Sequence, residues 1–513
     1  MVNNIEAVQS NLSYGRKKGF LRSCTMGILF LKISISFSYA NVYQTNRWRS
    51  NITPFLNKEK EEKKDKDEND QQAEYICYEK SIRCTMWNAD RVVNVDPYKD
   101  LHYQVGYSTL AFPKGRPTFY SASKKLSIAF GLYINYDIGA LLGPNKRANG
   151  PKVSSYQGTL RRGRPIIVVK YTDFALTVTP DIGRFGLEHH DLFGADLKYT
   201  GIKNLVIGGG LLQPTLSMLD SETSRGFFLA ERPMVIDMLR NVAGGEPRAG
   251  FNVIHWGQRY LISVGYTGQR VGKKFTNFQQ GQKGGVLRLA GRPIASRNID
   301  LHLGVTGTFA VHGENRKYSI VSYNESRLFP SAADFKTGTI NGVNSIWAVG
   351  PEFALRWKRL IFQGEYYSFF MPRKNEGYGH NDNLHFWGWY GSLNYAIFGA
   401  HRHYLPSRAI FAAPEGSLFN PAAGDWGALE WSVRWSYLNL NSHAGDYENN
   451  KYAAGVQGGK QKVIATGFNW YPSPHFRVMI DYNYIISSRA RNNLWHLRKK
   501  DSNLIISRLQ LTF

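Results

Sequence analysis

Apolar and polar residues alternate at every second position along much of the chain from about residue 126 to the last residue. The pattern covers Leu126–Ile138 and returns near residues 260–267, 299–306, 352–366, 429–437 and 476–484. Side chains two positions apart on a β-strand share a face, so the alternation predicts strands with one apolar and one polar face. Runs of about ten residues or more are long for the strands of a soluble protein.

Short connections alternate with long ones between these segments. Tyr171-Thr172-Asp173 and Pro472-Ser473-Pro474 are short, whereas residues 307–345 and 398–425 are long. Antiparallel strands of about ten residues, with short turns at one end and long loops at the other, predict a transmembrane β-barrel. Its apolar face would meet lipid and its polar face would line water, because only a closed barrel of strands satisfies every backbone polar group in lipid.

A soluble β-sandwich or propeller is the alternative fold. Such a protein would keep its apolar face inside and would not need an exposed row of Trp431, Trp435 and Tyr437. We therefore expect an all-β fold, a transmembrane antiparallel β-barrel. Residues 125–513, at roughly 24 residues for each strand with its share of loop, give about sixteen strands. Barrels of this size leave an aqueous lumen, so the sequence predicts a pore.

The end of the chain has the same periodicity. Leu509, Leu511 and Phe513 share one face of the final segment, with Arg508 and Thr512 on the other. The chain stops on Phe513, within the predicted strand. A last strand with a terminal aromatic residue and apolar residues at every second position resembles the assembly signal that bacterial outer-membrane barrels present to the barrel-assembly machinery.

The first 40 residues have the pattern of an export signal. A basic region that ends at Arg22 precedes the apolar segment Met26–Phe37, and Ser38-Tyr39-Ala40 supplies small residues for a cleavage site. Residues 41–124 are expected to form an N-terminal periplasmic segment, with a linker that mixes charges of both signs. The barrel would occupy residues 125–513. After export, the mature chain would retain Cys77 and Cys84, which can pair across a small loop.

Composition and net charge limit the kinds of molecule that the protein can be expected to bind. The chain of 513 residues is 42% hydrophobic and 14% aromatic, which excludes a disordered protein. Lys and Arg number 64 against 39 Asp and Glu, a formal net charge of +25. A basic excess indicates an anionic partner. The basic residues are spread singly through strand-like segments, which disfavours nucleic acid and leaves small anions and the lipid of the outer membrane.

Several short motifs follow one another in the predicted barrel. They are Leu160–Arg164, Gly210–Pro214, Phe228–Pro233, Arg248–Gly250, Gly427–Arg434 and Gly467–Tyr471. In this order and spacing the sequence resembles the phosphate-selective porin O and P family of Gram-negative outer membranes, from roughly Leu126 to Phe513. The resemblance implies a sixteen-stranded barrel, usually a homotrimer, whose third loop folds inward to form the constriction.

The third loop can be located in the sequence. Strand-like alternation ends near Leu212 and resumes near Phe251, and loops this long are uncommon unless they are functional. Arginine suits anion recognition because its planar guanidinium stays charged and offers paired donors. The alternative is that these arginines pair with acidic residues and hold the loop in place, above all at Glu231-Arg232. The candidate constriction residues are Asp220, Arg225, Glu231, Arg232, Arg240 and Arg248.

Cations on the polar faces of the strands form a second group of candidates. Glu352, Glu365, Glu430 and Asp481 oppose them, which predicts a mixed lumen lining with a cationic excess. Where the family often carries lysine before the proline that follows strand four, this chain has Gln213, so general anion preference is better supported than phosphate specificity. The candidate lining residues are Arg288, Arg356, Arg434 and Arg477 on the polar faces of strands, and Arg161, Arg162 and Arg164 at a strand entrance.

No enzyme, metal site or cofactor is expected. The histidine clusters at 188–191 and 401–403 are more typical of solvated loops than of a metal site. Nucleophile-elbow, HExxH and phosphate-cradling motifs do not occur in the sequence.

The sequence therefore favours an outer-membrane porin for passive diffusion of small anions, phosphate and polyphosphate among them. Three alternatives remain open: a general or carbohydrate porin, for which Tyr133 and Tyr367 would offer rings to sugars, an adhesin, and an outer-membrane enzyme.

Overall fold

The computed structural model describes residues 102–142, 156–183, 192–245, 248–270, 280–313, 316–322, 325–326, 328–329, 335–374, 383–414, 419–443, 455–491 and 494–513. All of them belong to the second of two units, Lys80–Phe513. The predicted signal peptide, the charged linker, Cys77 and Cys84 lie outside the described residues. No helix in the described residues is long and apolar enough to cross a membrane.

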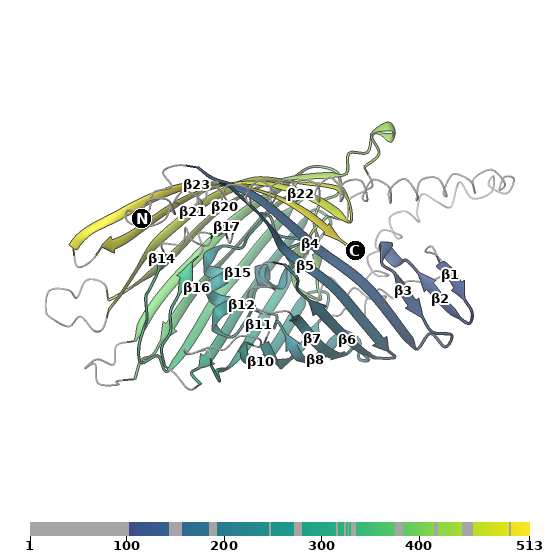
Figure 1. Ribbon diagram of the computed structural model, residues 1–513, viewed down its shortest axis with the longest axis horizontal. Helices are drawn as coiled ribbons and strands as arrows, with labels where there is room; N and C mark the ends of the chain where they lie inside the picture. Colours follow the sequence, from purple (N-terminus) through teal and green to yellow (C-terminus); the bar gives the residue numbers. More distant parts are fainter. Residues whose placement is uncertain are drawn as a thin grey trace, which may run out of the picture. The chain divides into compact units, whose positions relative to one another are not determined.

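Sixteen antiparallel strands form a closed barrel, as the strand arithmetic predicted (Figure 1). Each strand pairs with its neighbour in the chain, and the last strand pairs with the first, Leu509 opposite Tyr136. The strands are β4 (Leu126–Leu142), β5 (Tyr156–Tyr171), β6 (Phe174–Pro180), β7 (Leu192–Tyr199), β8 (Leu205–Leu212), β9 (Arg248–Trp256), β10 (Tyr260–Arg270), β11 (Lys283–Ala295), β12 (Ile299–Val311), β15 (Ser345–Trp357), β16 (Leu360–Met371), β17 (Leu384–Phe398), β20 (Ala428–Ser442), β21 (Val456–Ser473), β22 (Phe476–Arg491) and β23 (Leu494–Thr512).

Burial along the strands has the alternation that the sequence predicted. In β4 the side chains of Ser127, Ala129 and Asn135 are buried inside, whereas Phe130 is 49% exposed on the outer face. In β20 Arg434 points inward, and Trp435 is 52% exposed. The apolar face is therefore outside, the inverse of a soluble sandwich, as a barrel in lipid requires.

Three short strands precede the barrel and extend its sheet. They are β1 (His102–Val105), β2 (Ser108–Ala111) and β3 (Thr118–Tyr120). β3 pairs with residues 127–129 of β4, on the edge that β23 leaves uncovered where the chain ends. These strands lie before the barrel boundary expected at residue 125.

The barrel has one rim of short turns and one rim of long loops. Turns at 172–173, 257–259, 358–359 and 474–475 lie at the first rim, which we call the short-turn rim. The sequence predicts that all long connections lie at the opposite rim, and this prediction is wrong for one connection. Residues 399–427, between β17 and β20, leave from the short-turn rim and contain a hairpin of β18 (His403–Leu405) and β19 (Ile410–Ala412).

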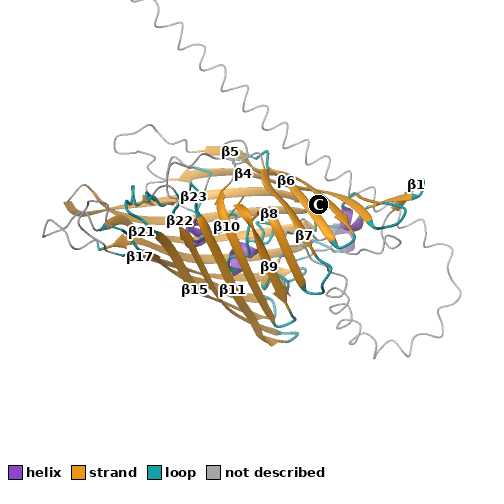
Figure 2. Ribbon diagram, turned by 90° about the horizontal axis from the view of Figure 1, so that it is seen from below, coloured by secondary structure: helices purple, strands orange, loops and turns teal. Residues whose placement is uncertain are grey.

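The third loop joins β8 to β9 and lies inside the ring of strands (Figure 2). It contains two helices that the alternation did not predict, α4 (Met218–Ser221) and α5 (Met234–Val242). Ser217 caps α4 by accepting a hydrogen bond from the Asp220 amide at 3.2 Å. Helix α5 buries Ile236 and Leu239 completely and leaves Asp237 partly exposed, so nearly its whole surface is covered.

Apolar patches on the inner wall explain why these segments fold inward. Near the long-loop rim, Phe369, Phe386 and Leu438 of the wall pack in one cluster with α5. Near the short-turn rim, Ile254, Leu261 and Ile361 pack with β18 and β19 in another. An apolar patch of this kind would face water in an open barrel, and covering it is favourable. Apolar patches therefore interrupt the predicted polar lining near both rims.

Candidate functional site

The register of β5 brings two consecutive arginines to the inside of the barrel. Successive strand residues normally point to opposite faces, but a β-bulge lies between the pairs Asn135–Arg162 and Tyr136–Leu160. Arg161 is the extra residue, and a bulge re-aims the side chain that it inserts. Both Arg161 and Arg162 are buried, with Arg164 on the same face two residues later. All three lie in the middle of β5, whereas the sequence reading put them at a strand entrance.

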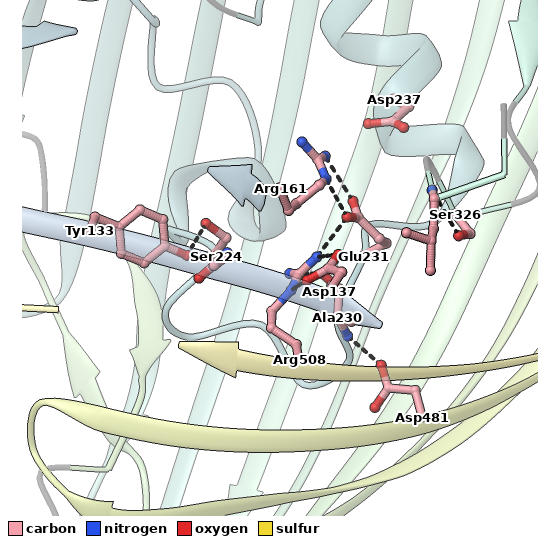
Figure 3. Close-up of polar contacts among 12 residues, drawn as sticks. Tyr133, Asp137, Arg161, Ser224, Ala230, Glu231, Asp237, Ser326, Asp481 and Arg508 are labelled. Carbon is pink, nitrogen blue, oxygen red and sulfur yellow. Dashed lines mark hydrogen bonds and ion pairs between the residues drawn. The ribbon is translucent and has the colours of Figure 1, made fainter. Parts of the chain in front are cut away.

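A chain of ion pairs fixes the third loop to the seam where the barrel closes (Figure 3). Arg508 of β23 donates to both carboxylate oxygens of Asp137 on β4, each at 2.7 Å. The same guanidinium lies 2.8 Å from Glu231 of the third loop, which accepts from Arg161 at 2.8 Å as well. Burial acts to raise the pKa of Glu231, but Arg161 and Arg508 outweigh it and hold that pKa well below its usual range.

Charged wall residues also hold the backbone of the third loop. Carboxylates accept from its amides: Glu352 from Met218 at 2.6 Å, and Glu365 from Leu219 at 2.8 Å. Arginines donate to its carbonyls: Arg434 to Glu231 at 2.7 Å, and Arg477 to Arg225 at 2.6 Å. A buried irregular segment needs such partners, because its N–H and C=O groups have no ladder to join. The wall therefore carries charges of both signs because its carboxylates bind the loop amides and its arginines bind the loop carbonyls.

Several of the predicted lining arginines are held by carboxylates of the wall or of the inward connections. Arg288 is 0% exposed and donates to Glu352 at 2.8 Å. Arg356 donates to Asp300 at 2.6 Å near the short-turn rim. Arg434 donates to Glu325 at 2.6 Å, in the connection between β12 and β15. They point inward, as the alternation predicted, and their lining of a water-filled path stays a prediction.

The predicted constriction residues divide into two groups. Arg248 donates to the carbonyl of Gly268 at 3.2 Å, and Arg240 lies 2.7 Å from Asp220, so both anchor the loop. Asp220 also accepts from Gln213 at 2.9 Å and lies 3.5 Å from Arg232. Glu231 belongs to the seam network above. Arg225, Arg232 and Asp220 border a cavity as well.

This cavity, of about 100 Å³, is the candidate functional site. The wall of β4 to β7 and the third loop line it, together with Ser407 of the β18–β19 hairpin and the last two residues, Thr512 and Phe513. Five arginines and two carboxylates line it, and they come from all three structures. The charged lining residues are Arg162, Arg164, Arg225, Arg232, Arg408, Asp220 and Glu222.

Neighbouring groups orient several of these side chains. Arg164 donates to Asp181 at 2.7 Å and lies over the ring of Phe193, 3.4 Å from its centroid. Arg225 donates to the carbonyl of Pro474 at 2.9 Å. The Tyr133 hydroxyl is 2.6 Å from the Ser224 hydroxyl, which ties the third loop to β4 (Figure 3). These contacts hold the side chains that line the cavity in defined positions.

Glu222 has an unusual environment at the edge of the cavity. Burial raises its pKa to about 8, against Arg402 and Arg477, which act to lower it. The Arg402 guanidinium lies 3.3 Å from its carboxylate. Below pH 8 the carboxyl group is mainly protonated, so Asp220 carries the main negative charge opposite the five arginines. Asp220 already contacts Arg240, and the cavity has a cationic excess.

Three important arginines are absent from the residues that the sequence singled out. Arg508 lies on the polar face of the last predicted strand, so the alternation could have identified it. Arg402 and Arg408 lie in the connection between β17 and β20, where no periodicity indicates which way a side chain points. The sequence predicts a solvated loop at residues 401–403, whereas Arg402 is buried against Glu430, with its Nε 2.9 Å from Oε1.

The remaining predictions have mixed outcomes. Leu509 and Leu511 are half-buried on the outer face of β23, and Phe513 exchanges backbone hydrogen bonds with Leu132 at 2.8 and 3.0 Å. The strand is confirmed, and its role as an assembly signal stays a prediction. Tyr367, a candidate sugar-stacking residue, is fully buried and donates to Glu365 at 2.7 Å. In the described residues no group of three or more His, Cys, Asp or Glu is placed to hold a metal ion.

Comparisons with solved structures give distant similarities. OmpT of Vibrio cholerae, an outer membrane protein in its trimer form, is 10% identical, with 76% of this chain and 99% of that chain covered and a TM-score of 0.44. The outer membrane channel DcaP of Acinetobacter baumannii is 11% identical, with 77% and 99% covered and a TM-score of 0.44. The anion-selective porin from Comamonas acidovorans is 9% identical, with 76% and 100% covered and a TM-score of 0.43. Similarity at this level does not indicate what this chain conducts.

No curated protein sequence matches the chain. The model of one family, phosphate-selective porin O and P, matches residues 323–513. The matched part contains the motifs at Gly427–Arg434 and Gly467–Tyr471, and the earlier motifs lie before it. This match confirms, over residues 323–513, the resemblance that the sequence indicated, and the chain is a porin-type β-barrel of the Gram-negative outer membrane.

Proposed function

We propose that the protein is a passive diffusion channel with a preference for small anions. The observation that carries the proposal is the cavity lining, where five arginines face two carboxylates, Asp220 and Glu222. Fixed charge of one sign in a narrow passage raises the local concentration of the opposite ion and excludes ions of like sign. The guanidinium groups stay charged at any physiological pH.

General anion preference is proposed in place of strict phosphate specificity. The described residues that line the cavity include no lysine. Gln213 donates its side-chain amide to Asp220, which leaves it little freedom to bind a solute. Arg164 and Arg225 each have another partner on the protein. Such groups attract an anion by charge, with fewer donors left for tight coordination of phosphate oxygens.

Variants of the cavity arginines test this function. Arg162→Gln and Arg225→Gln are each expected to reduce the chloride-to-potassium permeability ratio, measured from reversal potentials in planar bilayers. Arg297→Gln is the matched control, because Arg297 is an exposed residue of a short turn and the charge change is the same. The proposal fails if the two cavity variants retain the wild-type ratio while they conduct in discrete steps.

A carbohydrate porin is the second candidate, and one observation favours it. Tyr133 and Phe193 border the cavity and could stack on a sugar ring. Against this, Arg164 covers the Phe193 ring, and the Tyr133 hydroxyl is bound to Ser224. Block of the ion current by maltooligosaccharides at low concentration, with no chloride preference, would favour this candidate.

We also propose that the barrel forms a homotrimer through its wall of short strands. β6, β7 and β8 have 7, 8 and 8 residues, whereas a tilted strand needs about 9–11 to cross a bilayer. Leu197, 50% exposed, is among the apolar residues on the outside of this wall. Contact with a second copy would shield this part of the wall from headgroups and water. Light scattering of the detergent-solubilised protein would give the mass of three chains.

A further inference from the structure

The hairpin that enters from the short-turn rim is firmly seated in the barrel. We call residues 402–412 the inner hairpin; they comprise Arg402, β18, the turn 406–409 and β19. Tyr404, Ile410 and Phe411 are buried in the apolar cluster on the wall near this rim. The Tyr404 hydroxyl lies 2.9 Å from Nδ1 of His302 on β12. Because the hairpin packs against residues of the barrel wall, it is held in one position inside the barrel.

Arg402 locks the base of the inner hairpin to three other elements. It pairs in bidentate fashion with Glu430 of β20, with both N–O distances at 2.9 Å. It also lies 3.3 Å from Glu222 of the third loop and donates to Tyr471 of β21 at 3.2 Å. Its guanidinium is stacked over Phe228 of the third loop, 4.5 Å from the ring centroid. Bidentate pairs of this kind fix geometry as well as contribute energy.

Arg288 fixes the tip of the inner hairpin. It donates to the carbonyls of Arg408 at 2.7 Å and Ala409 at 2.9 Å, and to the hydroxyl of Ser221 in the third loop at 3.1 Å. Ala409 has a φ of 50°, a left-handed conformation that costs free energy in a residue with a Cβ. Such a conformation persists where the surroundings determine it, and the Arg288 contacts supply that constraint. The backbone at Arg408 is therefore held in one place.

The tip faces the same cavity as the third loop. Ser407 and Arg408 of the hairpin tip line it, and so do Arg225 and Arg232 of the third loop. An ion that occupies the cavity would pass both surfaces. The tip of the hairpin therefore shares the lining of this cavity with the third loop and the wall.

We propose that the inner hairpin is the second half of the constriction and that Arg408 at its tip is a specificity-determining residue for permeating anions. The inference rests on the proposed channel function and adds to it a residue and a direction: anions leave or reach the short-turn rim past Arg408. Its charge contributes to selectivity together with the arginines of the third loop and the wall. Arg402 and Arg288 are positioning residues, because they hold the inner hairpin and with it Arg408.

Chemical modification of a single cysteine tests the role of Arg408. Arg408→Cys is made in a chain whose three native cysteines are replaced by serine. Reversal potentials are recorded in planar bilayers under a KCl gradient, before and after a cationic or an anionic methanethiosulfonate is added at the short-turn side. The cationic adduct should raise the chloride-to-potassium permeability ratio about threefold over the unmodified cysteine, and the anionic adduct should lower it by a similar factor, as one unit charge acting across several ångströms of water would do. Arg297→Cys on the exposed turn is the matched control and should react without a shift.

The outcomes separate the inference from the proposed function. Opposite shifts at residue 408 and none at residue 297 support the inference, even if the wild-type pore shows no chloride preference, a result that would contradict the proposed function alone. A conducting Arg408→Cys pore whose potential does not move with either reagent overturns the inference while the wild-type preference stands. A folded wild-type protein that never conducts would overturn both.

Discussion

Charged residues on the inner wall of the barrel have two kinds of surroundings. Glu352 and Arg477 bind the backbone of the third loop, whereas Arg162 and Arg164 border the cavity. The first kind replaces the hydrogen bonds that a buried loop would otherwise lack. The second kind sets the local potential for ions. A count of inward charges therefore overstates the charge available to a solute.

At the residue scale, the sequence predicts which face of a strand a side chain lies on better than it predicts which residue that side chain binds. Alternation placed Arg288, Arg356 and Arg434 on the inner face, and they lie there. It also indicated that carboxylates such as Glu352 share that face, but not which arginine each would bind, because the register between strands is not given by alternation within one strand. The partner of Arg434, Glu325, comes from a connection with no period. Alternation also could not predict the bulge at Arg161, since a single extra residue shifts the register without a local composition signal.

Glu222 gives the channel a dependence on pH. Its pKa of about 8 means that it is mainly neutral at pH 7 and mainly ionised at pH 9. Arg402 and Arg408 of the inner hairpin, Arg477 of β22 and Glu430 of β20 face it. As the pH rises through 8, the cavity gains a negative charge, so the chloride-to-potassium permeability ratio should fall between pH 7 and pH 9.

Reversal potentials recorded at pH 6, 7, 8 and 9 measure this effect. The Glu222→Gln variant is the control, and its ratio should remain near the pH 7 value of the wild type throughout this range. An equal decrease in Glu222→Gln would assign the pH dependence to another group.

At the element scale, the strands followed from the sequence and the inward segments did not. Wherever the alternation occurs in the sequence, the structure has a long strand. The reason is that side chains facing lipid must be apolar, whereas those facing the inside can be polar. Helix α5 places Asp237, Arg240 and Asn241 on one face, but this is a helical period over only nine residues, which a search for alternation at every second position does not detect. The strands of the inner hairpin have three residues each, too few to show a period. The third loop was located through its length and the family resemblance, and the inward course of residues 399–427 could not be inferred from length alone.

Removal of Arg402 should release the inner hairpin. Arg402→Met leaves Glu430, which is fully buried, without its cation, a change that costs about 3–5 kcal/mol when one partner of a buried pair is lost. The barrel strands do not depend on this pair, so the variant should still migrate as a folded barrel in unheated gels. Single-channel records should show a larger and noisier conductance than the wild type.

The double variant Arg402→Met with Glu430→Gln is the matched control for the unpaired charge. It should fold as well as the wild type and retain the noisy conductance, because the lock is still absent. Quiet, wild-type steps in both variants would contradict the assigned role of Arg402.

At the scale of the whole molecule, closure of the barrel depends on residues that lie far apart in the sequence. Asp137 and Arg508 are directly opposite in the pairing of β4 with β23, and both are buried. A shift of one residue would send Arg508 toward lipid, so the pair favours one register. Glu231 adds the third loop to the same network, which links closure to the position of the constriction.

Arg508→Gln should weaken the closed barrel. The variant leaves Asp137 without its bidentate partner, and the free energy of unfolding should decrease by about 3–5 kcal/mol. Urea unfolding in lipid vesicles, followed by tryptophan fluorescence, measures this difference. Arg359→Gln on an exposed short turn is the control and should unfold with the wild type. Equal midpoints for Arg508→Gln and the wild type would exclude a role of the pair in closure.

The measurement that tests the central claim most directly is the zero-current potential of the wild-type protein in a planar bilayer under a tenfold KCl gradient at pH 7. A cationic cavity inside a closed barrel predicts discrete current steps and a potential of the sign set by chloride. A potential near zero, or one of the sign set by potassium, from protein that conducts in discrete steps would contradict it.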